Sequence, residues 1–283
     1  MKEVKFSTYN KELIPVNQKI FSSKNRAFRY GDGLFETMRS AHHEVQLINQ
    51  HTIRLLSSMR LLKMEIPFGF NAAGIHQEIK RLLSVNKIFG AARIRLSVFR
   101  NDGGLYTPKS NTPSFLIECE PVQNEHFKIN EKGLNVDIFT DHKKAKTVLS
   151  NIKSINCLPL ILAGIYKKEN QLDDVLICNT EGNIIEGLSS NLFIVKDDII
   201  ITPPLSDACV GGIMRNEIIQ ICKKEKLALL EQSITQEDIL KSSEIFLTNA
   251  IKGIQWISAF RDKRYLNTIP KILVRKLNEK VFN

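Results

Sequence analysis

The sequence lacks long apolar runs. None of its 283 residues form an uninterrupted apolar stretch long enough to cross a bilayer. The first residues, MKEVKFSTYNKEL, also lack the apolar core of a signal peptide. These two absences argue against a membrane span and against secretion, so we expect a cytoplasmic protein without a membrane partner.

Residue patterns typical of disulfides and metal sites are absent too. The five cysteines form no Cys-x-x-Cys pair, and their number is odd; they are Cys119, Cys157, Cys178, Cys209 and Cys222. Such spacing argues against a disulfide framework or a zinc knuckle. The six histidines form no His-Glu-x-x-His and no other metal-ligand spacing. We expect no protein-bound metal.

The net charge of +10 raises the possibility of a nucleic-acid partner. However, the lysines occur in short clusters, such as residues 143–146 and 223–226, and acidic residues are interspersed among them. Clusters of this kind are usually solvated faces. We expect no nucleic-acid partner and a general attraction for anionic small molecules.

Hydrophobic periodicity predicts a mixed chain. Apolar residues at helical spacing indicate helices over residues 47–62, 73–85, 158–169 and 213–226. Alternating or short apolar runs indicate strands over residues 93–98, 114–119, 134–139, 175–178, 191–195, 199–201 and 244–247. Strands and helices in both halves predict an α/β or mixed α+β protein of two domains.

A polar stretch ending near Gly133 is the best candidate for a linker. It divides the chain into a small N-terminal α/β domain (residues 1–120), the linker (121–132) and a larger C-terminal domain (133–283). An active site is expected where the two domains meet.

Two segments of the chain carry residues that could take part in catalysis. Residues 150–156 (SNIKSIN) place Lys153 in a polar run between a predicted strand and a predicted helix. Apolar neighbours could desolvate this lysine and make its amine nucleophilic, although an exposed loop lysine is the commoner case. Residues 180–193 place Glu186 after two isoleucines, where a buried carboxylate needs a partner such as a pyridinium nitrogen; a solvated strand-end carboxylate is the alternative.

Two further segments are glycine-rich. Residues 30–39 (YGDGLFETMR) contain two glycines, which permit tight backbone geometry; a turn before a strand explains them equally well. Residues 210–215 (VGGIMR) precede a helical pattern. Amides at a helix N-terminus attract anions, so this segment is a candidate phosphate site, although Gly-Gly is also common as a simple turn.

Together, in this order and at these distances, the four segments resemble the fold-type IV (class IV) PLP-dependent aminotransferase family. The resemblance runs from about Arg26 to about Trp256 and resides in the combination rather than in any single piece. Members include branched-chain aminotransferases, D-amino-acid transaminases and aminodeoxychorismate lyases. The resemblance implies a two-domain fold like that of the D-amino-acid enzymes, a PLP-binding C-terminal domain and a homodimer.

The resemblance also implies roles for individual residues. Lys153 matches the lysine that binds the cofactor covalently, and Glu186 matches the carboxylate facing the pyridine nitrogen. Arg54 matches an arginine that contacts the cofactor phosphate. The rest of the implied phosphate site is backbone at Ile213, Met214, Asn249 and Ala250. The implied substrate-binding residues are Tyr30, Phe35, Arg100 and Tyr106.

Three features resemble the lyases more than the transaminases. Thr37 follows Glu36 where branched-chain enzymes typically have glycine, and in the lyases a threonine here is thought to assist catalysis. Residues 97–106 look like the lyases' Arg/Gly-rich loop ending in Tyr. Gly-Ile-Met-Arg at 212–215 and Asn-Ala at 249–250 also look lyase-like. One departure is Cys157, where many transaminases have tyrosine and some lyases arginine; a thiol is a weak hydrogen-bond partner.

The resemblance therefore implies a folate-pathway lyase that converts 4-amino-4-deoxychorismate to 4-aminobenzoate and pyruvate, with Lys153 and Thr37 as catalytic residues. A branched-chain or D-amino-acid transaminase uses the same lysine and returns the proton to the cofactor instead. A non-catalytic basic protein that binds PLP or nucleic acid is a third hypothesis, but it leaves the joint presence of Lys153, Glu186 and Arg54 unexplained. Motifs that hold the cofactor are shared by all members, so they do not select a substrate.

Overall fold

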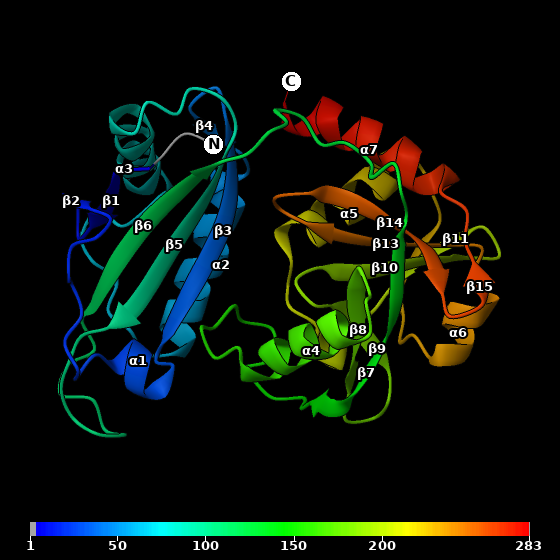
Figure 1. Cartoon of the computed structure of the whole chain (residues 1–283), viewed down its shortest axis with the longest axis horizontal. Coiled ribbons are helices and arrows are strands. Elements are labelled where there is room, and N and C mark those ends of the chain that lie inside the picture. Colours follow the sequence, from blue (N-terminus) through cyan, green and yellow to red (C-terminus); the bar gives the residue numbers. More distant parts are fainter. Residues whose placement is uncertain (1–3, 283) are drawn as a thin grey trace. The chain divides into compact units, whose positions relative to one another are not determined.

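The computed structural model describes residues 4–282 and divides into two compact units (Figure 1). Unit 1 comprises the chain up to Glu125 together with Ile152–Asn156. Unit 2 comprises His126–Asn151 and the chain from Cys157 onward. This division differs from the predicted one in a functionally important place, because the five residues around Lys153 belong with the N-terminal unit.

Unit 1 is built on a six-stranded antiparallel sheet in the order β2-β1-β6-β5-β3-β4. Its strands are β1 (Phe6–Tyr9), β2 (Glu12–Pro15), β3 (Gly33–Ala41), β4 (Glu44–Val45), β5 (Ala92–Arg100) and β6 (Pro113–Pro121). Its helices are α1 (Arg26–Tyr30), α2 (Ile48–Leu61) and α3 (Ala72–Val85). The predictions of α2, α3, β5 and β6 are confirmed to within two residues at each end.

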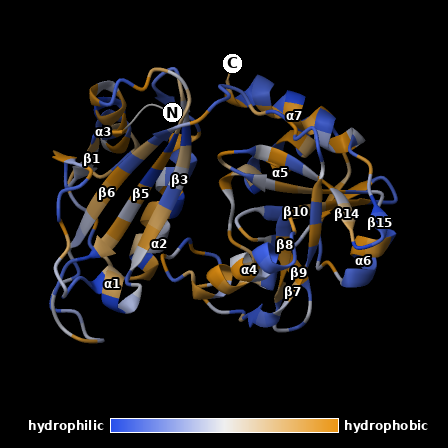
Figure 2. Ribbon diagram, in the orientation of Figure 1, coloured by the Kyte–Doolittle hydropathy of each residue, from blue (hydrophilic) through white to orange (hydrophobic). Residues whose placement is uncertain are grey.

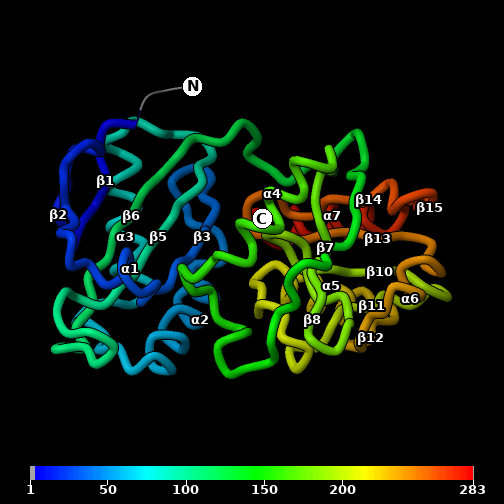
Figure 3. Tube along the Cα trace, turned by 60° about the horizontal axis from the view of Figure 1, so that its bottom comes forward, coloured from blue at the N-terminus to red at the C-terminus, as the bar shows by residue number. Residues whose placement is uncertain are grey.

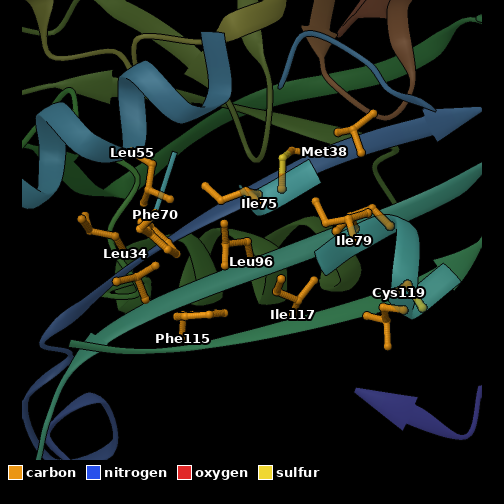
Figure 4. Packing of buried hydrophobic residues seen from close by; sticks show 14 of the residues in the cluster. Leu34, Met38, Leu55, Phe70, Ile75, Ile79, Leu96, Phe115, Ile117 and Cys119 are labelled. Carbon is orange, nitrogen blue, oxygen red and sulfur yellow. The ribbon is translucent and has the colours of Figure 1, made fainter. Parts of the chain in front are cut away.

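The core of unit 1 lies on one face of this sheet. Figure 4 shows Leu34 and Met38 of β3 and Leu96 of β5 pointing toward side chains of α2 and α3, including Leu55 and Ile79. Leu34 and Met38 are four residues apart and share a face, because successive side chains of a strand point to opposite faces. Phe35 and Thr37 of β3 and Arg95 of β5 therefore lie on the other face of the sheet.

The segment Ile152–Asn156 joins unit 1 by pairing with the start of β3. The amide of Phe35 donates to the carbonyl of Lys153 at 2.9 Å, and the amide of Ile155 donates to the carbonyl of Gly33 at 3.1 Å. A Cβ at position 33 would lie 2.8 Å from the Ile155 side chain and from the Val98 carbonyl. Glycine is therefore required here by close approach of the chain rather than by a turn.

Unit 2 is built on a nine-stranded sheet. Its strands are β7 (Leu134–Lys144), β8 (Asp174–Asn179), β9 (Ile184–Gly187), β10 (Asn191–Lys196), β11 (Ile199–Thr202), β12 (Leu229–Glu231), β13 (Glu244–Asn249), β14 (Gly253–Phe260) and β15 (Lys263–Arg264). The order is β12-β11-β10-β13-β14-β7-β8-β9, and β15 pairs with β14. Figure 3 shows β13, β10 and β11 following one another in this order. Because β9 also pairs with β10, strands β10, β13, β14, β7, β8 and β9 form a closed ring.

Four helices in the described part of the chain pack against the strands of this ring, and the buried side chains of the ring strands contribute to two hydrophobic clusters. They are α4 (Leu158–Glu169), α5 (Ile213–Lys224), α6 (Gln236–Lys241) and α7 (Thr268–Val281), with a 3-10 turn at Leu205–Asp207. Alternate residues of β8 go to different cores: Leu176 packs with residues of the other ring strands, whereas Val175 and Ile177 pack in a second cluster with Ala163 of α4. None of the described helices is long and apolar enough to span a membrane.

Candidate active site

Lys153 lies against the ring of Phe35. Its Nζ is 4.2 Å from the ring centroid, and both residues are half-buried. The backbone bridge between residues 152–156 and β3 fixes this neighbourhood, because it holds the Lys153 carbonyl to the Phe35 amide. The lysine is therefore positioned by strand pairing and by an aromatic face, as expected for a cation near a π system.

The same face of β3 and β5 carries a second cation, Arg95. Its guanidinium carbon lies 4.1 Å from the Phe35 ring centroid, and its Nε donates to Ser97 Oγ at 3.2 Å. The register of the sheet places Arg95 directly opposite Thr37. Lys153, Phe35, Thr37 and Arg95 thus form one group, in which two positive charges contact one ring and a hydroxyl lies on the neighbouring position.

Arg95 is a residue that the sequence alone did not single out. It appeared only as one member of an alternating strand. The alternation of arginines with apolar residues in β5 is a signal that could have identified Arg95 as a candidate. Its proximity to Lys153, however, depends on the pairing of three separate segments.

Glu186 occupies the point where the unit 2 ring closes. It pairs with Ile177 of β8 on one side and with Asn191 of β10 on the other. Its side chain is 7% exposed, and Oε1 accepts from Lys144 Nζ at 2.7 Å. Oε2 accepts from the amide of Val210 at 2.9 Å. A buried carboxylate is stable only with such partners, and its two oxygens have further lone pairs for one more donor.

The chain leading into α5 is tied to Glu186 and Asn191. The side-chain Nδ2 of Asn191 donates to the carbonyl of Val210 at 2.7 Å, and a Cβ on Gly212 would lie 1.8 Å from Asn191 Oδ1. Gly212 is the N-cap residue of α5, and no side chain caps this helix end. The first turn contains the buried Ile213 and Met214. An uncapped helix N-terminus is suited to hold an anion through its amides and its dipole.

Asn249 is the last residue of β13, and Ala250 lies in the turn between β13 and β14. The Asn249 side chain accepts from the amides of Ile251 and Lys252, at 3.1 and 2.8 Å, and donates to Ser190 Oγ at 3.0 Å. The side chain therefore shapes its own turn and links it to the hairpin that follows Glu186. The turn is ordered by these bonds, and its role in binding phosphate stays a prediction.

Arg54 of α2 belongs to an ionic cluster with His51 of the same helix and the buried Glu36 of β3. Its Nε donates to Glu36 Oε1 at 2.8 Å and its Nη2 to Glu36 Oε2 at 2.5 Å. His51 Nδ1 lies 2.7 Å from Glu36 Oε2. Burial alone would raise the pKa of Glu36, but the charge of Arg54 and the hydrogen bond with His51 outweigh it and lower the pKa to about 2. The sequence indicated Arg54 but gave no sign that Glu36 and His51 hold it.

Arg100 is held in a network of its own. Its Nε lies 3.0 Å from Asp32 Oδ2, its Nη2 donates to the carbonyl of Leu62 at 2.7 Å, and its Nη1 donates to Asn111 Oδ1. Arg26 shares Asp32 at 2.8 Å and also donates to the carbonyl of Leu105 at 2.6 Å. Arg100 is 6% exposed and ties β5 to Asp32, Leu62 and Asn111, whereas Arg26 is the arginine that contacts the loop of residues 101–109.

The predicted substrate-binding tyrosines contact each other. The rings of Tyr30 and Tyr106 are 5.7 Å apart, and the Arg26 guanidinium lies 5.0 Å from the Tyr30 ring centroid. Tyr106 is 90% exposed. Cys157 is half-buried and directly precedes the first turn of α4. Among the described residues, no group of three or more His, Cys, Asp or Glu is arranged to hold a metal ion.

Relatives of this chain include enzymes of three kinds. A putative branched-chain-amino-acid aminotransferase of Methanocaldococcus jannaschii is 28% identical, over 89% of this chain and 86% of the relative. A D-alanine aminotransferase of Bacillus licheniformis is 24% identical, over 85% and 83%. An aminodeoxychorismate lyase of Vibrio harveyi is 24% identical, over 83% and 85%. The similarity is spread across these activities and does not choose among them.

Solved structures share the fold. A putative 4-amino-4-deoxychorismate lyase of Legionella pneumophila superposes with a TM-score of 0.84 and 24% identity, covering 93% of this chain and 96% of the other. A branched-chain aminotransferase of Thermobaculum terrenum in its PLP form superposes with a TM-score of 0.83 and 21% identity, covering 99% of this chain and 93% of the other. The family model for amino-transferase class IV matches residues 33–260, which include Lys153, Glu186, residues 210–215 and the first glycine-rich segment from Gly33 onward. The chain belongs to the class IV amino-transferase family.

Proposed function

We propose that this chain is a PLP-dependent 4-amino-4-deoxychorismate lyase that forms 4-aminobenzoate and pyruvate. The observation that carries the proposal is the position of Thr37, on the same face of β3 as Phe35, against which Lys153 lies. This arrangement puts a hydroxyl group and a lysine amine in one neighbourhood, as an elimination that needs a base and a proton donor requires. The likeness of Thr37 to the lyase threonine supports the same reading.

The described residues fit PLP. Lys153 supplies the amine, Glu186 is a buried carboxylate with capacity for one more donor, and α5 begins with an uncapped turn after Gly212. Arg54 is a fixed guanidinium, which is suited to a phosphate. When bound, the cofactor supplies an electron sink for the carbon that bears the substrate amine.

The residues of this chain divide the proton transfers between them. The Lys153 amine takes the proton from the ring carbon that bears the amino group. The bond between the neighbouring carbon and the ether oxygen then breaks, and the oxygen leaves with the electron pair. Thr37 donates a hydrogen bond to this oxygen as charge develops on it. Enolpyruvate takes up one proton to become pyruvate, and the ring becomes aromatic, so no external oxidant or acceptor is needed.

We propose Arg95 as the residue that binds a substrate carboxylate beside Lys153. Replacing Arg95 by leucine should raise KM roughly 10- to 100-fold, because a charge-assisted hydrogen bond contributes about 1.5–3 kcal/mol. Steady-state kinetics measure this. The matched control is Arg93→Leu: Arg93 lies two residues earlier on the same face of β5 and pairs with Glu120 at 3.2 Å. Equal KM values for the two variants would contradict the role of Arg95.

The alternative is a branched-chain or D-amino-acid transaminase. The branched-chain relative, at 28% identity, favours it. In that reaction Lys153 would move a proton without expelling a leaving group, the bound cofactor would carry the amino group, and a keto acid would be needed to complete each cycle. The two readings therefore differ in one measurable requirement, the acceptor.

An end-point assay separates these readings. Purified protein with PLP and aminodeoxychorismate, without any keto acid, should release 4-aminobenzoate and pyruvate in equal amounts. The first product is measured by its fluorescence after chromatography and the second by coupled NADH oxidation. Parallel reactions contain leucine, valine or D-alanine with 2-oxoglutarate. Turnover that occurs only in the parallel reactions would overturn the lyase proposal and favour the transaminase.

We also propose that the enzyme is a cytoplasmic homodimer. All five cysteines are unpaired, as is usual in a reducing compartment. The helix α4 has an exposed apolar stripe formed by Leu158, Ile161, Leu162 and Ile165. Figure 2 shows the apolar character of this helix as orange ribbon. Contiguous apolar patches on a helix favour burial against another surface. A second copy of the chain is the partner that the family resemblance implies.

A further inference from the structure

Glu36, His51 and Arg54 form a hydrogen-bonded cluster, although a single arginine is sufficient to bind a phosphate group. Glu36 lies on β3 with a side chain 2% exposed, and it faces α2, which carries the other two residues. Leu34 and Met38, on the same face of β3, are fully buried apolar residues. Glu36 and His51 are thus enclosed in the hydrophobic core of unit 1, whereas the Arg54 side chain that they hold is 15% exposed.

A gain in stability does not account for the burial of these charged groups. Enclosing an ion pair costs desolvation energy, and an apolar pair of similar volume is often as stable or more stable. The gain lies in geometry, because Glu36 binds Arg54 through two parallel hydrogen bonds and His51 fixes the carboxylate from the side. Such two-point contacts determine the orientation of a planar guanidinium.

Burial and the neighbouring charges together set the charge states of the cluster. Burial raises the pKa of Glu36, but the charge of Arg54 and the hydrogen bonds with His51 and Arg54 lower it to about 2, so the carboxylate is ionised near neutral pH. Burial lowers the pKa of His51, and the charges of Arg54 and Lys153 lower it further, although Glu36 opposes this. A neutral imidazole next to an ionised carboxylate donates its Nδ1 proton, since the carboxylate can only accept. His51 therefore acts as a neutral donor.

We propose that Glu36 and His51 are positioning residues that hold the Arg54 guanidinium in the orientation in which it binds the cofactor phosphate. The inference rests on the proposed function, since it requires PLP as the ligand. Glu36 also lies between Phe35 and Thr37 in the sequence, so one strand presents the reacting face on one side and orients the phosphate ligand on the other. Arg54 fixed in advance loses little freedom when the phosphate binds.

The test compares two ligands that differ only in the phosphate. Binding of PLP and of pyridoxal to the purified protein is measured by absorbance and by equilibrium dialysis. Arg54→Gln should weaken PLP about 100-fold, and Glu36→Gln about 10-fold, with pyridoxal unchanged in both. The double variant should resemble Arg54→Gln alone, because residues that act through one another are not additive. His51→Leu should give a smaller effect in the same direction.

A second carboxylate bound by arginines provides the control. Asp32, whose side chain is 14% exposed, is held by Arg26 and Arg100 in the same unit, so Asp32→Asn removes an arginine-paired charge away from Arg54. It should lower stability in urea without changing the ratio of PLP to pyridoxal affinity. If Glu36→Gln does not fold, Glu36→Asp keeps the charge, withdraws it by one methylene group and should change the same ratio.

The outcomes are distinguishable from failure of the proposed function. Wild-type protein that does not bind PLP would overturn both proposals. Wild-type protein that binds PLP, with Glu36→Gln and Glu36→Asp showing the wild-type affinity ratio, would overturn the positioning role alone. Parallel loss of PLP and pyridoxal affinity would also overturn it, since that result indicates a merely structural effect.

Discussion

Replacement of Lys153 by alanine is expected to abolish turnover, with a loss of at least about 1,000-fold. The amine both holds the cofactor and acts as the base, and general base catalysis alone contributes roughly 100- to 10,000-fold. Lys153→Arg should be equally inactive, because it keeps a positive charge near Phe35 but offers no amine for covalent attachment. The measurements are turnover and the mass of the protein after borohydride treatment.

The control for this prediction is Lys143→Ala. Lys143 is an exposed lysine of β7 and lies outside the group around Phe35. It should retain wild-type turnover and the borohydride-dependent mass increase of one pyridoxyl group. Substantial turnover by Lys153→Arg, or a mass increase that maps to another lysine, would remove the basis of the proposed function.

Replacement of Glu186 by glutamine is expected to reduce kcat by roughly 100- to 1,000-fold with little change in KM. A neutral amide cannot stabilise a positive charge on the pyridine nitrogen, and loss of one preorganised charge partner in a buried site typically has this effect. The isosteric amide still accepts from the Val210 amide, so the strand ring should remain closed. Steady-state kinetics and the absorption spectrum of the bound cofactor across pH provide the measurement.

Glu181→Gln serves as its control. Glu181 is an exposed carboxylate in the turn between β8 and β9 and pairs with Lys146. Its loss should leave kcat and the spectrum unchanged. If Glu186→Gln kept kcat within about threefold of the wild type, the carboxylate would have no role in the electron sink, and its function would be limited to its bonds with Lys144 and Val210.

Local patterns predicted four regular elements of unit 1 well, whereas α1 and the strands β1 to β4 were not predicted. Helices α2 and α3 and strands β5 and β6 have one buried face, so their residues repeat with the period of the element. The elements β9, β12, β14, β15, α6 and α7 of unit 2 were missed, and two of them illustrate different causes. Strand β14 is buried without strict alternation, which removes its period of two. Helix α7 buries Leu273, Val274 and Leu277 at helical spacing, so its signal was present and was overlooked.

The second half of strand β7 could not be predicted from the local sequence pattern. The prediction ended at Phe139, but the strand continues to Lys144 through exposed polar residues. Its far end pairs with Asn179 of β8, and that pairing brings Lys144 to Glu186. A polar extension has no hydrophobic pattern, so only a partner strand reveals it.

The sequence by itself determined the family, the mixed α/β fold and the residues that match the cofactor motifs, because these depend on residue identity and spacing along the chain. Tertiary structure alone decided which residues meet. Arg95 beside Phe35 follows from the β3–β5 register, the Glu36–Arg54 pair from the packing of α2 on β3, and the place of Glu186 from closure of the strand ring. Such contacts join residues far apart in sequence, and the free energy that selects them comes from burial of the whole core rather than from any local segment.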